Sequence, residues 1–244
     1  SQTFVEKIDP RSVADVVFTW PQSIAKVVRS CEIPTDVVLG IDLSGSMNND
    51  GGAPPQPVTA ALEAAGQFVG TLRAKDQVAV TTFATHAQLT DTLTNNREAL
   101  ADKITSLKIQ PAEERGFTNT VEALQMALGE LDSERHNPDA RRVLVLLTDG
   151  LPTAAGNADV VEQAIKQAQV LREQNIDVYT IGLGENVDRA FIQSVASDNK
   201  KAYFAPTGSD LAAIYKEITS SLCEVGPTKI DVYAKTKTNF AVIE

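Results

Sequence analysis

The stretch Val37-Val38-Leu39-Gly40-Ile41-Asp42-Leu43-Ser44-Gly45-Ser46 indicates both the fold class of this chain and its chemistry. Its first half is almost wholly apolar, which is typical of a strand buried on both faces, as the central strands of parallel sheets are. Its second half places one carboxylate and two hydroxyl groups on alternate residues of a glycine-containing turn. Oxygen donors without any softer ligand suit a hard divalent cation such as Mg²⁺. The stretch therefore predicts a metal site at the end of a central strand.

Downstream of residue 35 the chain alternates between strand-like and helix-like segments. Apolar runs predict strands at 77–83, 143–147, 176–181 and 202–205, and a weaker, partly polar edge strand at 87–93. Apolar residues recur at helical spacing in 58–72, 100–107, 121–131, 161–171, 191–195 and 211–222. Strands joined by such helices predict right-handed crossovers and a doubly wound α/β fold with a mostly parallel sheet. A Gly- and Pro-rich stretch, 48–57, should separate the metal-site turn from the first helix.

Composition narrows the range of partners. The chain has 22 Lys and Arg against 32 Asp and Glu, a net charge of -10. Without a basic run or interleaved aromatic and basic residues, nucleic acid is not an expected partner. No apolar stretch approaches the roughly 20 residues that a membrane-spanning helix needs. We therefore expect neither a nucleic-acid interface nor a membrane span in this chain.

The two ends of the chain differ in pattern from the α/β region. Residues 13–18 and 24–28, and then 229–234 and 239–243, read as β-strands without intervening helices. The simplest organisation is an α/β domain over 31–223 with a small β extension formed by 1–30 and 224–244.

The two cysteines fall at the boundaries of the α/β region. Cys31 precedes its first strand and Cys223 ends its last predicted helix. A disulfide between them would join the two ends of the core and imply an oxidising compartment. The alternative is a pair of unrelated reduced thiols.

Two further oxygen ligands fall where open α/β sheets bind ligands, at the carboxyl ends of strands. Asp149 follows the strand at 143–147, and Thr118 stands at the entry to a helix. Each also has a plain structural reading. Asp149 could belong to an ordinary turn and Thr118 could cap the helix, although Asn119 with Glu122 forms a better cap.

Together these residues resemble the metal-ion-dependent adhesion site of the von Willebrand factor type A domain. The resemblance rests on Asp42-x-Ser44-x-Ser46, on Thr118 in a Gly-Phe-Thr-Asn-Thr loop and on Thr148-Asp149-Gly150, in that order. The stretch 182–188 is similar to another recurrent segment of that family, and the likeness covers residues 35–222. It implies a Rossmann-like six-stranded sheet of order 3-2-1-4-5-6 whose edge strand, near 87–93, is antiparallel.

The resemblance also assigns ligands. Ser44 and Ser46 would bind Mg²⁺ through their hydroxyl groups, with Mn²⁺ or Ca²⁺ as substitutes. Thr118 would bind directly or through water, and Asp42 and Asp149 would bind directly or hold coordinating waters. An open coordination position would then accept an Asp or Glu carboxylate from a protein ligand.

This implies an extracellular or cell-surface adhesion module, with a bacterial pilus, its tip included, or another surface adhesin as the expected setting. The ligand would be a host or matrix protein or a neighbouring surface or pilus subunit. The alternative is a non-adhesive scaffold or assembly subunit that uses the same site for metal-dependent contacts within a complex.

Enzymatic readings of the same motifs fit less well. An aspartyl phosphohydrolase usually needs a second carboxylate two residues after its nucleophile, where Ser44 stands. Gly182-Leu183-Gly184 lacks the third glycine of a dinucleotide fingerprint, and Ser44 lacks the glycine that precedes a hydrolase nucleophile. His86 and His136 are isolated, and we interpret them as an edge-strand and a surface residue. We expect no catalytic site.

Overall fold

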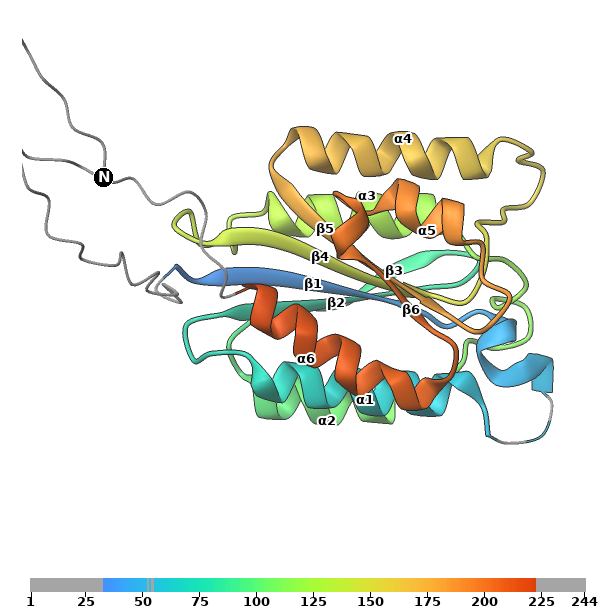
Figure 1. Ribbon diagram of the computed structural model, residues 1–244, viewed down its shortest axis with the longest axis horizontal. Helices are drawn as coiled ribbons and strands as arrows, with labels where there is room; N and C mark the ends of the chain where they lie inside the picture. The colour runs from blue at the N-terminus through green and yellow to red at the C-terminus, as the bar shows by residue number, and fades with distance from the viewer. Residues whose placement is uncertain (1–32, 52, 54, 223–244) are drawn as a thin grey trace, which may run out of the picture.

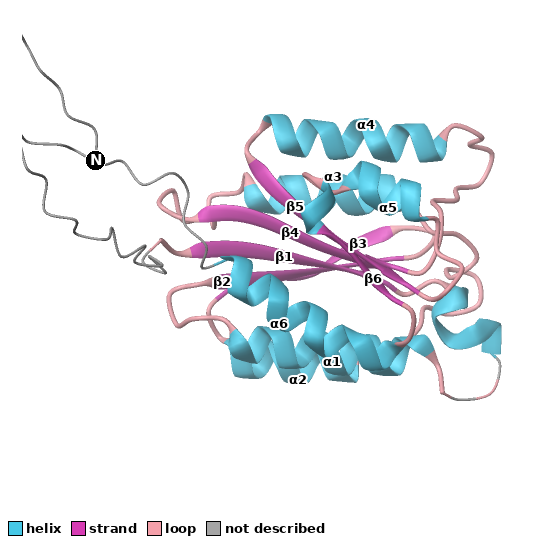
Figure 2. Ribbon diagram, in the orientation of Figure 1, coloured by secondary structure: helices cyan, strands magenta, loops and turns pink. Residues whose placement is uncertain are grey.

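The computed structural model describes residues 33–222 except residues 52 and 54. One sheet, ordered β3-β2-β1-β4-β5-β6, lies between two layers of helices (Figures 1 and 2). The strands are β1 (Thr35–Asp42), β2 (Gln77–Phe83), β3 (Ala87–Thr94), β4 (Arg141–Thr148), β5 (Ile176–Leu183) and β6 (Ala202–Ala205). The α-helices are α1 (Pro57–Thr71), α2 (Arg97–Ser106), α3 (Thr120–Leu131), α4 (Val160–Glu173), α5 (Arg189–Val195) and α6 (Leu211–Leu222). This is the predicted doubly wound α/β fold with the predicted strand order.

The central strand β1 explains the arrangement of the sheet. All eight of its residues are buried, and it pairs in parallel with β2 on one side and β4 on the other. Val37, Leu39 and Ile41 enter one hydrophobic core, whereas Val38 enters the other. A strand that supplies both cores has no polar face, which is why its sequence reads as a continuous apolar run.

Each face of the sheet carries its own layer of helices. Helices α1, α2 and α6 cover one face, and α3, α4 and α5 cover the other (Figure 1). On the first face the rings of Phe68 and Tyr215 lie 4.9 Å apart, between α1 and α6. On the second, Leu124 of α3 and Leu171 of α4 are fully buried. The helical stripes of the sequence are therefore core faces, as predicted.

The antiparallel edge strand β3 is joined to α3 by a hydrogen bond to the buried carboxylate of Glu130. Glu130 accepts a hydrogen bond of 2.7 Å from the Leu93 N–H group and two from Arg135, at 2.6 and 2.9 Å. Burial alone raises the pKa of Glu130, but these hydrogen bonds and the Arg135 charge outweigh it and leave the pKa below its ordinary value.

The stretch 48–57 separates the metal-site turn from α1, as expected, and the 3-10 helix η1 (Gly45–Gly51) occupies its first part before α1 begins at Pro57. Two expectations about the histidines need correction. His136 is not a surface residue, since its side chain is only 19% exposed and its Nδ1 lies 2.8 Å from an oxygen of the buried Asp36. His86 occupies the exposed turn before β3.

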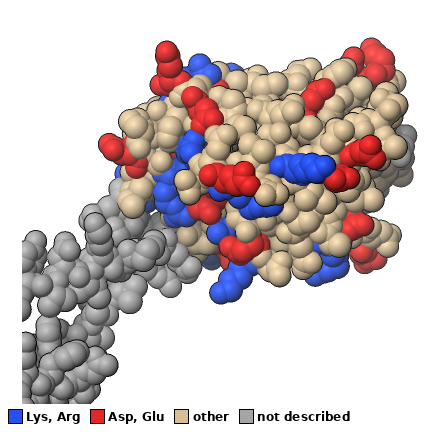
Figure 3. All heavy atoms as spheres, turned by 90° about the horizontal axis from the view of Figure 1, so that it is seen from above, with Lys and Arg blue, Asp and Glu red and all other residues tan. Residues whose placement is uncertain are grey.

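Other expectations fall outside the described residues. They are the β extension formed by 1–30 and 224–244, both cysteines, and therefore the disulfide and the domain boundaries. Within the described part of the chain, no helix has both the length and the apolar character needed to cross a membrane. On the face formed by α3, α4 and α5, acidic and basic side chains are interspersed without a continuous basic patch (Figure 3).

Candidate metal centre

The candidate site lies where the connections of the sheet diverge. Strands β1 and β4 run side by side and end together, with Ile41 opposite Leu147. After β1 the chain crosses to α1 on one face, whereas after β4 it crosses to α4 on the other. Such a switch point leaves a crevice at the carboxyl ends of the strands. In Figure 1 it lies at the end of the sheet marked by η1, the blue helical turn.

Asp42, the last residue of β1, forms the buried base of the site. Its side chain has no exposed surface. One carboxylate oxygen accepts a hydrogen bond of 2.8 Å from the Ser44 N–H group, and the other accepts one of 2.7 Å from the Thr148 hydroxyl group at the end of β4. Asp42 is therefore held in one orientation by both strands that border the crevice.

Ser44 and Ser46 bring their hydroxyl groups together above this base. The two hydroxyl oxygens lie 3.2 Å apart, with Ser44 buried and Ser46 exposed. Ser46 donates a hydrogen bond of 2.8 Å to Oδ1 of Asp149, directly after β4. Two loops far apart in the sequence thus connect Asp42, Ser44, Ser46 and Asp149 through hydrogen bonds.

Thr118 lies on a third loop, which is hydrogen-bonded to the segment after Asp149. Its backbone forms an isolated antiparallel bridge with Thr153, with hydrogen bonds of 3.2 and 2.9 Å, and its N–H group also donates to the Thr153 hydroxyl group at 2.9 Å. Thr118 is 7% exposed, and within the described residues no hydrogen bond involves its hydroxyl group. The predicted helix cap is correct, because the Asn119 side chain accepts from the Glu122 N–H group at 3.2 Å. Thr118 is thus not needed as a cap.

Burial makes the charged form of Asp42 costly when no cation is nearby. Burial raises the pKa of the Asp42 carboxyl above its ordinary value, and the hydrogen bonds from Ser44 and Thr148 oppose this only in part. An adjacent cation would stabilise the ionised Asp42 carboxylate, because it would compensate the buried negative charge.

The donor set fits a hard cation of the Mg²⁺ class. Asp42, Ser44, Ser46, Thr118 and Asp149 present only carboxylate and hydroxyl oxygens, the ligands that Mg²⁺ prefers. Within the described residues, no cluster of three or more His, Cys, Asp and Glu side chains forms a competing site for a softer metal.

Sequence reasoning missed the residues that join the loops. The Gly45 N–H group donates to the Arg115 carbonyl group at 2.9 Å, which ties the first loop to the one that carries Thr118. Thr153 ties that same loop to the segment after Asp149. Arg115 and Thr153 are ordinary loop residues, and no local sequence pattern indicates that they join these loops.

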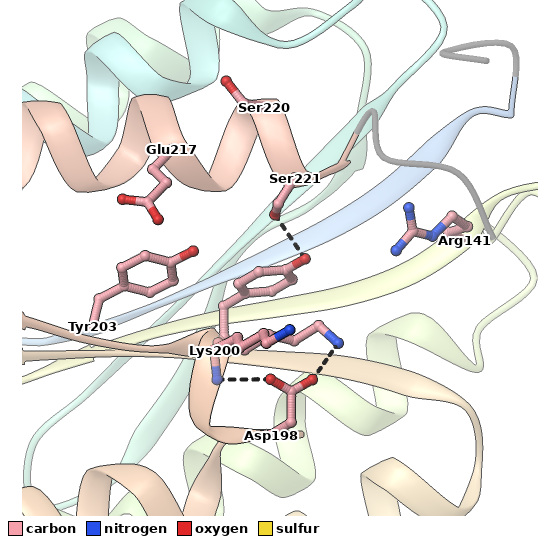
Figure 4. A pocket seen from close by; sticks show the side chains of 9 residues that line it. Arg141, Asp198, Lys200, Tyr203, Glu217, Ser220 and Ser221 are labelled. Atoms are coloured by element: carbon pink, nitrogen blue, oxygen red, sulfur yellow. Dashed lines mark hydrogen bonds and ion pairs between the residues drawn. The ribbon is translucent and has the colours of Figure 1, made fainter. Parts of the chain in front are cut away.

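A pocket of about 420 Å³ lies elsewhere, between α6 and the sheet (Figure 4). Ser221 donates there to the Tyr179 hydroxyl group at 2.9 Å, and Lys201 pairs with Asp177 and Asp198 at 3.2 and 2.9 Å. None of the five predicted metal ligands lines this pocket, and two of its charged side chains, Lys201 and Asp198, are paired with each other.

The sequence profile of the von Willebrand factor type A domain matches residues 36–217. The chain belongs to this family. Inter-alpha-trypsin inhibitor heavy chain H2 from Mus musculus is 27% identical over 203 residues, which cover 78% of this chain and 20% of that protein. A UPF0353 protein from Nocardia farcinica is 30% identical over 168 residues, 67% of this chain and 48% of the relative. The chain thus spans about a fifth and about half of these two relatives.

Solved structures share the fold at low identity. Proximal thread matrix protein 1 from the mussel byssus has a TM-score of 0.69 at 19% identity, over 80% of this chain and 49% of its own. The von Willebrand factor domain of the type V pili tip protein Mfa5 from Porphyromonas gingivalis has a TM-score of 0.66 at 16% identity. The match covers 81% of this chain and 98% of that domain's chain. Another structure of the mussel protein has zinc in its metal-ion-dependent adhesion site. It has a TM-score of 0.63 at 19% identity and covers 78% of this chain and 46% of its own.

Proposed function

We propose that this chain is an adhesion module that binds a protein ligand through a divalent cation, Mg²⁺ in the first instance. The cation would be held by Asp42, Ser44, Ser46, Thr118 and Asp149. The observation that carries the proposal is the hydrogen bond of 2.8 Å between Ser46 and Asp149, which closes a ring of oxygen donors over the buried Asp42.

The chemistry of the donors supports binding rather than catalysis. Serine and threonine hydroxyl groups are neutral, so a cation bound mainly by them keeps much of its charge and attracts a further anionic ligand. The ligand's Asp or Glu carboxylate supplies that group. The residues at the site include neither a histidine nor a cysteine that would act as a base or nucleophile.

The setting is proposed from the relatives and the cysteines. The Mfa5 domain belongs to a pilus tip protein, and a pilus adhesin from Lactobacillus rhamnosus matches this chain over 78% of its length with a TM-score of 0.62. A Cys31–Cys223 disulfide would suit the same extracellular compartment. We therefore place the protein at a cell surface, with a host, matrix or neighbouring surface protein as its ligand.

Thermal unfolding with and without metal tests the site. Mg²⁺ binds only the folded site, so it should raise the melting temperature of the wild type by mass action. Asp149→Ala should abolish the rise, whereas Asp139→Ala, an exposed aspartate outside the site, should retain it. If neither Mg²⁺ nor Mn²⁺ changes the wild-type melting temperature, the site assignment is wrong. A pull-down from candidate host surfaces with and without chelator tests the adhesive role.

A further inference from the structure

One apolar side chain stands out at the edge of the metal site. Among the described residues, the large apolar side chains with substantial exposure are Ile33, Leu151 and Val170. Ile33 precedes β1, at the opposite end of the sheet, and Val170 belongs to α4. Leu151 is 42% exposed and stands two residues after Asp149. Of these three side chains, only Leu151 belongs to the segment that directly follows a proposed metal ligand.

The backbone holds Leu151 in place. The Gly150 N–H group donates to the Thr148 hydroxyl group at 3.4 Å, and Pro152, the next residue, is buried. Thr153 is bridged to Thr118 by two backbone hydrogen bonds. An apolar side chain fixed on both sides by anchored backbone is a preorganised contact, and preorganisation lowers the entropic cost of binding.

An arginine lies on the neighbouring loop. Within the described residues, the Arg115 guanidinium takes part in no hydrogen bond, ion pair or ring contact, although the Arg115 carbonyl group holds Gly45. Each of the other described arginines has such a contact: Arg73, Arg97, Arg135, Arg141, Arg142, Arg172 and Arg189. Arg115 is thus available for a ligand carboxylate, for which guanidinium is well suited.

The charge of the surroundings limits the ligand further. Glu113 and Glu114 precede Arg115 and are exposed, and the whole chain carries a net charge of -10. A strongly acidic tract would be repelled by this surface, whereas a single carboxylate between uncharged neighbours would not.

We propose, on the basis of the adhesive function above, that the ligand segment carries one acidic residue with a large aliphatic or aromatic residue directly beside it. The carboxylate completes the metal site and is contacted by Arg115. The apolar neighbour packs on Leu151. Metal coordination thus supplies affinity for any exposed carboxylate, and these two rim residues select which segment is bound.

Selection from a displayed library of random twelve-residue peptides tests this proposal. The full chain is immobilised with Mg²⁺, and bound peptides are eluted with EDTA. We expect the eluted peptides to be enriched in a single Asp or Glu next to Leu, Ile, Met or Phe, and depleted in runs of acidic residues.

Substitutions of Leu151 and Arg115 then test whether these two residues determine which peptides bind. Binding of the strongest eluted peptide should fall at least tenfold in Leu151→Ser and in Arg115→Gln. It should be retained in Leu151→Met and in Val170→Ser, the matched exposed apolar residue on α4. Affinity for Mn²⁺ alone, measured by calorimetry, should stay unchanged in all four variants.

Two other outcomes overturn the proposal and are distinguishable. If EDTA elutes peptides that share an acidic residue but show no preference beside it, or that bind Leu151→Ser and wild type equally, the rim contacts are wrong and the adhesive function stands. If EDTA elutes no enriched peptide at all, the proposed function fails and this inference falls with it.

Discussion

Ser46 and Asp149, 103 residues apart in the sequence, are joined by a hydrogen bond of 2.8 Å between the serine hydroxyl group and the aspartate carboxylate. The bond connects the loop after β1 to the loop after β4, the two strands that meet at the centre of the sheet. A hydroxyl group that donates to a carboxylate keeps its lone pairs for a cation. This pair therefore brings together the two kinds of ligand that a hard-metal site requires.

The response to Mg²⁺ should depend on pH. Because the pKa of Asp42 is raised by burial, the folded metal-free protein binds this proton more tightly than the unfolded chain does. The contribution of Asp42 to stability is therefore present at acidic pH and is lost as pH rises through the raised pKa. Mg²⁺ needs the ionised form and should compensate for that loss. The Mg²⁺-induced rise in melting temperature should thus be larger at pH 7.5 than at pH 5, and an equal rise at both values would contradict this role of Asp42.

The buried Glu130 predicts a pH effect of opposite sign. Its folded-state pKa is lowered, so its stabilising contribution is present above the unfolded value near 4.5 and is lost as pH falls through the folded pKa. Glu130→Gln should lower the free energy of unfolding at pH 7 by about 1–3 kcal/mol and by clearly less at pH 3. Urea denaturation at both pH values measures this. Glu162→Gln, which removes an exposed pair with Lys166, should show no measurable change at either pH.

A close contact between α1 and the segment before α6 predicts the effects of two glycine substitutions. A Cβ atom added to Gly208 would lie 2.3 Å from the Cβ atom of Ala60, so Gly208→Ala should destabilise the protein by about 1–3 kcal/mol through overpacking. A Cβ atom added to Gly70 in α1 meets nothing within 4 Å. Gly70→Ala should therefore stabilise by about 0.5–1 kcal/mol. Chemical denaturation of both variants gives the two values, and equal signs would refute the packing argument.

The cysteines give a prediction about compartment. We expect peptide mapping by mass spectrometry without reductant to find Cys31 and Cys223 in one linked peptide pair. Reduction should then lower the free energy of unfolding by about 2–4 kcal/mol. Recovery of both residues as alkylated free thiols would instead favour the reduced, intracellular scaffold as the setting.

Most of the fold follows from local pattern, because apolar spacing reports directly which faces are buried. The run at Val37–Ile41 marks β1 as central since every side chain in it enters a core. The proposed ligands Asp42, Ser44, Ser46 and Asp149 could be grouped from the sequence because they stand at or just after the carboxyl ends of β1 and β4, which are neighbouring parallel strands. By contrast, the partner of His136 lies 100 residues away at Asp36, and no local pattern reports such a contact.

The same limit applies at the rim of the site. Arg115 and Thr153 join the loops mainly through backbone hydrogen bonds, which any residue can make and which therefore leave little trace in residue type. The 3-10 helix η1 was missed for a related reason, since short 3-10 segments form without a periodic apolar stripe. Sequence thus predicts the candidate ligands, and the structure was needed to identify which contacts hold their loops together.

The most direct test of the central claim is an anomalous difference map from crystals of this chain grown with Mn²⁺. We predict one strong peak among the hydroxyl oxygens of Ser44, Ser46 and Thr118 and the carboxylate of Asp149, absent in crystals of Asp149→Ala. A peak that persists in the variant, or Mn²⁺ bound elsewhere with these residues left empty, would contradict the assignment.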